Sequence, residues 1–488
     1  MTWETVIGLE VHAELSTKTK IFCACSTDFS GEPNIHVCPI CAGMPGALPK
    51  LNREVVEYAL RLGLTLGCEI ARNCKLDRKN YFYPDLPKAY QVSQLYAPIC
   101  RDGRLEIETA GQNEQKKQKK LKKNIRIREI HMEEDAGKLL HDPQSGTTHM
   151  DFNRCGVPLL EIVSQPDFTS GAEALAYLEQ LRETLLYLGV CDCKMQEGSL
   201  RADVNLSVRP AGGEMGVRTE MKNLNSFKAI SRAIEYEAAR QIEVLEKGGQ
   251  IVQETRRWDD DKGESLSMRS KENAQDYRYF PEPDLLPIEI GDQWLERIRR
   301  DLPELANQKR ERYKQDYGLA EFDAAVLTSH KNISDLFENV LKRSGEPLES
   351  AHLITGEIMR LMNGTNTLPE DLSLDSGKLA SLVLLVLSGK INRNAYKETV
   401  EAVFTGNADP DEYIAEKGLM MVSDSGAILE AVTAVLDDNP GAVSDYLAGK
   451  DRAFGFLMGQ SMKMLKGTGD PAMLRETLKE ALDNQDNL

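Results

Sequence analysis

The sequence predicts an α+β amino-terminal domain built on antiparallel sheet, then an all-α helical domain and a small all-α tail. Residues 1–295 hold short segments in which apolar and polar side chains alternate, the period of a half-buried strand. Three prolines in residues 280–287 then interrupt the chain. Beyond them, apolar residues recur at the i, i+3, i+4, i+7 spacing of amphipathic helices. We therefore place three domains at residues 1–295, 296–407 and 408–488.

The first strand is predicted over residues 6–15, which alternate strictly. One face would carry apolar side chains into the core. The other would carry Glu10 and His12, so that a carboxylate and an imidazole project side by side. For this strand taken alone, a plain half-solvated face is the favoured explanation.

Four cysteines follow in two tight pairs, Cys23 with Cys25 and Cys38 with Cys41, separated by twelve residues. Zinc prefers four thiolates in a closed tetrahedral site, and a Cys-Pro-X-Cys turn can aim backbone N–H groups at the sulfurs. Two disulfides or four unrelated thiols are the alternatives. The spacing favours a structural zinc site, which organises the fold and takes no part in chemistry.

Further strands are predicted over residues 105–109, 125–130 and 201–209. The last repeats the mixed polar face with Arg201 and Asp203, and the strand at 125–130 runs into an acidic turn at 131–137. Carboxylates gathered with an imidazole suit Mg²⁺, which takes oxygen ligands and bridges nucleotide phosphates. Solvated acidic turns are the competing explanation. The lysines of residues 116–123 indicate the solvated tip of a hairpin.

Two other segments are rich in polar side chains. Residues 77–91 mix aromatic, cationic and amide groups around two prolines, which predicts an ordered loop, either functional or covering a sheet edge. Ser226 is placed as the N-cap of the helix that follows it. Later helices are predicted around Leu382 and around Val432, the second ending at residues 439–441.

The charge balance limits the partners. A formal net charge of −17 and a pI near 5.1 exclude attraction of nucleic acid to the whole surface, so an RNA partner requires a local basic face. Neither a signal peptide nor an apolar membrane-spanning run is found. We expect a soluble, cytoplasmic protein.

Taken together, seven ordered motifs resemble one family, the B subunit of the bacterial glutamyl/aspartyl-tRNA amidotransferase. The likeness covers essentially the full length. The motifs lie at residues 4–12, 77–85, 131–137, 197–201, 222–226, 277–283 and 455–459. Departures occur at the basic insertion around 116–123 and at residues 469–471, where they affect surface and tail more than chemistry.

The resemblance implies a cradle-like catalytic domain and ATP-dependent transamidation of misacylated tRNA. ATP phosphorylates the side-chain carboxylate of Glu-tRNA(Gln) or Asp-tRNA(Asn), and ammonia displaces the phosphate. It also implies an obligate heterotrimer with an amidase, the A subunit, which releases ammonia from glutamine, and a small third chain, the C subunit. ATP, Mg²⁺ and structural Zn²⁺ are the implied cofactors.

Site residues follow from the matching motifs. Glu10, His12 and Glu134 would hold Mg²⁺ and phosphate, with Asp260 a further metal candidate whose acidic neighbours leave its register open. Lys79 would mark where ammonia arrives, with Asp203 positioning it or buffering its proton. The implied nucleotide or acyl-phosphate contacts are Arg201, Lys222, Asn223 and Arg257.

Two other classes of function stay open on the sequence. The chain could be a noncatalytic, zinc-stabilised tRNA-binding subunit, which fits the helical regions but leaves the polar strand faces unexplained. It could also be a self-contained ATP-dependent ligase that uses free ammonia. Whether Glu-tRNA(Gln), Asp-tRNA(Asn) or both are substrates depends on the synthetases of the cell.

Overall fold

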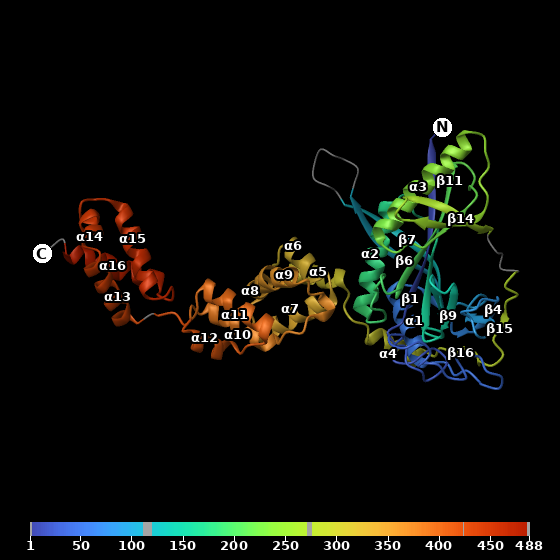
Figure 1. Ribbon diagram of the computed structural model, residues 1–488, viewed down its shortest axis with the longest axis horizontal. Coiled ribbons are helices and arrows are strands. Elements are labelled where there is room, and N and C mark those ends of the chain that lie inside the picture. The colour runs from blue at the N-terminus through green and yellow to red at the C-terminus, as the bar shows by residue number, and fades with distance from the viewer. Residues whose placement is uncertain (1, 111–119, 271–275, 423, 486–488) are drawn as a thin grey trace. The chain divides into compact units, whose positions relative to one another are not determined.

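The computed structural model describes residues 2–110, 120–270, 276–422 and 424–485. It divides into two compact units, Met1–Leu305 and Ala306–Leu488, which we describe separately. Figure 1 shows the first as a sheet flanked by helices and the second as helices throughout. This confirms the α+β class with helical regions following it, while the division into three domains stays a prediction. No helix among the described residues combines the length and apolar character needed to span a membrane.

Within the described residues of the first unit, nine strands form one sheet. All neighbours pair antiparallel except β12 with β13, a parallel pair that the sequence did not indicate. In spatial order the strands are β14 (Glu264–Ser270), β13 (Glu254–Asp259), β12 (Thr219–Lys222), β11 (Leu200–Pro210), β1 (Trp3–Glu14), β10 (Pro158–Ser164), β7 (Lys120–Glu134), β6 (Cys100–Ala110) and β2 (Glu69–Ile70).

One face of this sheet carries the hydrophobic core. Ile7, Leu9 and Val11 of β1 are at most 1% exposed and pack in one cluster with side chains from the helices. The covering helices are α1 (Arg53–Thr65), α2 (Gly171–Leu188) and α3 (Phe227–Glu246), with α4 (Asp292–Arg300) packed on α1. Because side chains alternate along a strand, the polar residues of β1 and β11 must share the opposite face. The predicted N-cap of α3 is confirmed, since the Ser226 side chain accepts a hydrogen bond from the Ala229 N–H.

Smaller sheets accompany the large one in this unit. Residues 77–91, which we predicted as a loop, begin and end in strands, so that prediction was wrong at both ends; the loop of residues 81–89, which holds both prolines, joins them. Their polar composition hid the strands. The small sheets join β15 (Phe280–Pro281), β4 (Asp77–Asn80) and β5 (Tyr90–Ser93); β16 (Ile288–Glu289) and β3 (Asn73–Cys74); and β8 (Lys138–Asp142) and β9 (Thr147–Asp151).

The described residues of the second unit form two separate hydrophobic cores, one built from residues 313–414 and one from residues 428–482. Helix α13 ends at Asp438 with Asn439 as its C-cap, at the predicted place, and α14 begins at once with Pro440. Of the predicted hairpin tip, Lys116, Lys117 and Lys119 lie outside the described residues, whereas Lys122 and Lys123 belong to β7 and pair with β6, so that part is strand. The helices are α5 (Ala306–Tyr317), α6 (Glu321–Leu327), α7 (Lys331–Ser344), α8 (Pro347–His352), a π-helical turn (Leu353–Ile358), α9 (Met359–Thr365), a 3₁₀ turn (Pro369–Asp371), α10 (Ser376–Leu387), α11 (Arg393–Gly406), α12 (Pro410–Lys417), α13 (Ser425–Asp438), α14 (Pro440–Leu447), α15 (Asp451–Met464) and α16 (Pro471–Gln485).

Candidate active site

Strand register assembles the site on the polar face of the sheet. His12 of β1 lies opposite Glu161 of β10, and Glu161 lies opposite His131 of β7. Residues directly opposite each other share a face, so three adjacent strands bring these side chains into one row. Glu133 is two residues beyond His131 and therefore also faces the row.

These side chains converge within contact distance. His12 Nε2 lies 3.4 Å from Glu161 Oε2 and 4.0 Å from Glu133 Oε2. His131 Nε2 lies 2.8 Å from Glu161 Oε2 and 3.3 Å from Glu133 Oε1. One ligand atom from each of His12, Glu133 and Glu161 falls within 4.8 Å of the others. Two carboxylates and one imidazole at this spacing form a group that fits a divalent cation.

The charges of this group are set by their mutual contacts. Burial favours the neutral acid at Glu161, yet His131 and His12 together hold its pKa well below the usual range. Burial likewise lowers the pKa of His131, but the carboxylates of Glu161 and Glu133 outweigh it and raise that pKa to about 10. These contacts favour an ionised Glu161 carboxylate beside a protonated His131 imidazole.

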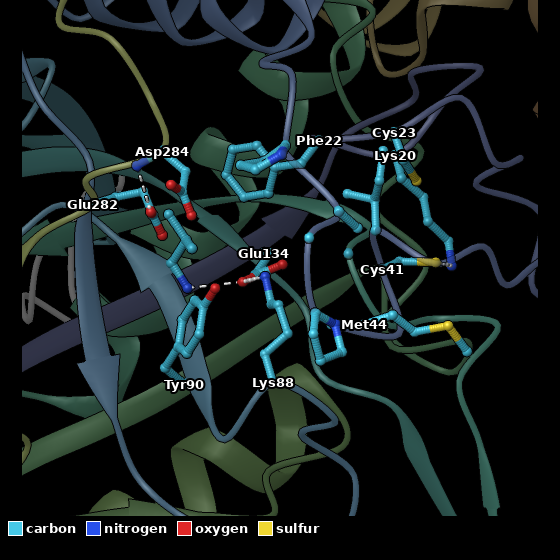
Figure 2. A pocket seen from close by; sticks show the side chains of 18 residues that line it. Lys20, Phe22, Cys23, Cys41, Met44, Lys88, Tyr90, Glu134, Glu282 and Asp284 are labelled. Atoms are coloured by element: carbon cyan, nitrogen blue, oxygen red, sulfur yellow. Dashed lines mark hydrogen bonds and ion pairs between the residues drawn. The ribbon is translucent and has the colours of Figure 1, made fainter.

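Glu134, predicted as the acidic ligand, is not brought to this group. It lies on the opposite side of β7, ion-paired with Lys88, and its Oε1 accepts a hydrogen bond of 2.8 Å from the Val92 N–H. This pair lines a cavity of about 210 Å³ beside the cysteine loops, and Figure 2 shows the two side chains pointing toward each other. Neighbouring strand residues face opposite sides, so only one of Glu133 and Glu134 can reach His12. The sequence motif did not say which.

Glu10 lies on the same face as His12, two residues earlier on β1. Its Oε1 accepts a hydrogen bond of 2.9 Å from Asn205 Nδ2, and it pairs in register with Asp203. Asp203 Oδ2 in turn lies 2.5 Å from Lys222 Nζ. Burial alone would lower the pKa of Lys222, but Asp203 and Glu220 raise it, which keeps this lysine charged. Glu10 and Asp203 thus extend the row of polar groups away from His12.

Three other predicted residues also project from this region. Arg201 lies opposite His12 and donates a hydrogen bond of 2.9 Å to Asp135 Oδ2. Arg257 lies opposite Lys222 on the parallel strand and is exposed. Lys79 sits on β4 with its Nζ 4.9 Å from the centre of the Tyr277 ring, a cation–π contact.

Asn223 and Asp260 have structural surroundings instead. Asn223 Nδ2 donates to the Trp258 carbonyl at 2.9 Å, and its backbone has a φ of 65°, so it shapes the turn before α3. Asp260 Oδ1 accepts from Trp258 Nε1 and from Arg232 Nη2, both at 2.7 Å. Trp258 is buried among the core side chains and Arg232 belongs to α3. The structure therefore does not bring Asp260 to the His12 group.

A second pair of carboxyl groups lies at the end of this row. Glu14 and Asp135 are hydrogen-bonded to each other in a buried position beside Arg201 and Arg154. Burial and the neighbouring Asp135 raise the pKa of Glu14 to about 8. The arginines oppose the effect of burial on Asp135 and lower its pKa, so the shared proton resides on Glu14.

This shared proton predicts a pH dependence of stability. Because the folded-state pKa of Glu14 lies above its unfolded value, its contribution is complete below the ordinary glutamate pKa of 4.5 and is lost as pH rises through about 8. Glu14→Gln keeps a neutral group there. We expect the melting temperature of the unmodified protein to fall more steeply than that of Glu14→Gln between pH 6 and pH 9. Parallel melting curves over this range would contradict the shared proton.

The four cysteines converge as predicted. One sulfur from each of Cys23, Cys25, Cys38 and Cys41 lies within 4.8 Å of the others. The Cys38 and Cys41 sulfurs are 3.8 Å apart, about the edge of a tetrahedron with zinc–sulfur bonds of ~2.3 Å. The Cys38 N–H also points at the Cys41 sulfur, 3.1 Å away. All ten cysteines are free, so the disulfide alternative is not realised, and the donor set fits zinc.

Sequence reasoning missed Glu133, Glu161 and His131. Glu161 belongs to a strand of mostly apolar residues, in which a single carboxylate is itself a signal that we did not use. Glu133 shares the strand parity of His131, and this would have selected it over Glu134.

Comparisons with known proteins identify the family of this chain. Residues 5–296 match the GatB/GatE catalytic domain, and residues 335–482 match the GatB domain. The chain is 56% identical over 481 residues to the aspartyl/glutamyl-tRNA(Asn/Gln) amidotransferase B subunit of Lachnoclostridium phytofermentans, covering 98% of this chain and 99% of that one. It is 56% identical over 487 residues to the protein of that name in Caldicellulosiruptor bescii, covering 99% of this chain and 100% of the relative. A relative from Thermodesulfovibrio yellowstonii with the same name is 49% identical over 483 residues, covering 99% of this chain and 100% of the relative. This chain therefore belongs to the GatB/GatE family.

Proposed function

We propose that this chain is the B subunit of a tRNA-dependent amidotransferase, a ligase that forms a carbon–nitrogen bond. It transfers the γ-phosphoryl group of ATP to the side-chain carboxylate of Glu-tRNA(Gln), Asp-tRNA(Asn) or both. Ammonia then displaces the phosphate to leave an amide. The observation that carries the proposal is the group of His12, Glu133 and Glu161 on the polar face of the sheet. This sheet belongs to the part of the chain that matches the GatB/GatE catalytic domain.

The chemistry explains the charges of this face. A carboxylate resists attack by ammonia until one oxygen becomes a phosphate leaving group. Mg²⁺ bound to phosphate neutralises the oxygens of the transferring group. We assign His12, Glu133 and Glu161 to hold this cation, with Glu10 beside them. His131 contacts both carboxylates and orients them.

The cations around this group suit the anionic reactants. Lys222, Arg201 and Arg257 project from strands on the β11 side of β1 and would contact the nucleotide phosphates and the acyl phosphate. We assign Lys79 to the place where ammonia arrives. Asp203 is ion-paired with Lys222 and therefore orients this lysine. We also assign Asp203 to face the incoming ammonia.

The ammonia requires a partner. We propose a heterotrimer with an amidase A subunit, which releases ammonia from glutamine, and a small C subunit, acting in the cytoplasm on tRNA(Gln) and tRNA(Asn). We assign tRNA contact to the helical tail of residues 408–488. The cysteine group supports the fold beside β1 by binding one zinc ion.

A direct assay separates this proposal from its two rivals. The purified chain and the heterotrimer each receive misacylated Glu-tRNA and radiolabelled ATP, with either ammonium chloride or glutamine. We expect ammonium chloride to support ATP-dependent formation of Gln-tRNA, and glutamine to support it only in the heterotrimer. Absence of phosphoryl transfer under all conditions would indicate a noncatalytic tRNA-binding protein. Full activity of the chain alone with glutamine would indicate a self-contained enzyme.

A further inference from the structure

Lys20 is a lysine without solvent contact. Its relative exposure is 0%, and it ranks among the largest fully buried side chains of the described residues. Removing an ammonium group from water is costly unless hydrogen bonds and an opposite charge compensate it. Lys20 therefore calls for a specific anionic partner.

The contacts of its ammonium group show where that charge comes from. Lys20 Nζ donates to the His36 carbonyl at 2.8 Å and to the Phe152 carbonyl at 3.3 Å, and it lies 3.8 Å from the Cys41 sulfur. Figure 2 shows the amine of Lys20 directed at Cys41. Among the described residues, no Asp or Glu carboxylate forms an ion pair with Lys20. The carbonyls satisfy its N–H groups but supply no net charge.

The four-cysteine group supplies the missing negative charge. Four thiolates around one Zn²⁺ leave two negative charges, and these are also removed from water because Cys41 is only 6% exposed. An ammonium group 3.8 Å from one of the sulfurs is a strong source of compensation at this distance. Lysine and cysteine group thus each provide what the other lacks.

We propose that Lys20 is the charge-compensating and positioning residue of the four-cysteine centre. Its ammonium group offsets the excess negative charge of the metal-bound thiolates. It also joins three segments of chain: its own, the cysteine loop with His36 and Cys41, and the segment of Phe152 after β9. This inference concerns the metal centre alone and does not depend on the proposed enzymatic function.

The same lysine links the cysteine loops to the catalytic strands. Next to Lys20, the Ile21 N–H donates to the Gly156 carbonyl at 2.9 Å, and the Gly156 N–H donates to the Asp135 carbonyl at 2.9 Å. Residues 152–157 lead directly into β10, which carries Glu161. Loss of the ammonium contact would therefore loosen the segment between the zinc centre and the His12 group.

The test compares metal-loaded and metal-free protein. Lys20→Met removes the charge at similar length, and Lys20→Gln retains a hydrogen-bond donor for the carbonyls without the charge. Lys18→Met, at an exposed position two residues away, is the matched control. Zinc affinity is measured by chelator competition on the full-length chain, and melting temperature is measured with and without zinc.

We expect both Lys20 variants to bind zinc ~10- to 100-fold more weakly, the usual effect of losing a contact to a metal ligand. The melting temperature should fall further in the zinc-loaded protein than in the metal-free protein, because the thiols carry less charge without zinc while the carbonyl contacts are lost in both. Cobalt(II) substitution reports directly on thiolate ligation in each variant. Unchanged zinc affinity, or equal losses of stability with and without zinc, would overturn the proposal. If Lys20→Met does not fold, the same comparison on Lys20→Gln decides.

Discussion

Replacing Glu161 by glutamine is expected to lower ATP-dependent amidation by at least ~10²-fold, equivalent to roughly 3 kcal/mol of transition-state stabilisation. Glu161 contacts both His12 and His131, so its charge holds the centre of the group. Glutamine keeps the volume, and the neighbouring Ile162 on the core face is unaffected. The sheet should therefore stay folded. Formation of Gln-tRNA by the heterotrimer measures amidation, and circular dichroism measures folding. Glutamine hydrolysis, assayed separately, measures the amidase subunit.

Two carboxylate variants control this result. Glu106→Gln changes an exposed carboxylate of β6 that forms an ion pair with Lys122, so it should retain activity. Glu134→Gln removes the partner of the buried Lys88 and should lower the melting temperature without weakening Mg²⁺ binding. Near-normal activity of Glu161→Gln would contradict the assignment of Glu161 to the metal group. Loss of Mg²⁺ binding confined to Glu134→Gln would instead identify Glu134 as the ligand, as the sequence motif first indicated.

Removing one cysteine should change metal content and stability together. Cys38→Ser is expected to lower zinc below one ion per chain, because a closed site that loses one thiolate no longer completes its tetrahedron. A loss of ~2–3 kcal/mol corresponds to roughly 3–5 °C in melting temperature for a unit of this size, at an unfolding entropy of ~2.1 cal/mol/K per residue. Elemental analysis and thermal melts of the same sample measure both.

Cys68 provides the matched control, since it is partly buried in the same unit but does not belong to the four-cysteine group. Cys68→Ser should keep full zinc content. Chelation of the unmodified protein should reproduce the melting temperature of Cys38→Ser. A metal-free protein that is fully active and equally stable would contradict the assignment of a structural zinc site.

Local patterns were enough for much of the fold. Strict alternation identified β1 and β11 and assigned their faces correctly, because a strand has a period of two whatever it pairs with. The spacing of the cysteines identified their group, since a short loop between two tight pairs leaves few other ways to satisfy four thiols. Ser226 identified the start of α3 because capping acts within a single turn.

The membership of the metal group depended on the tertiary structure. Glu161 reaches His12 only because β10 lies between β1 and β7, an order that no local pattern encodes. Glu133 was chosen over Glu134 by strand register, where a shift of one residue exchanges the two faces. Asp260 was directed toward α3 by the burial of Trp258. The sequence by itself thus determined the kinds of chemical group and the strands that carry them, whereas long-range strand pairing decided which of those groups meet.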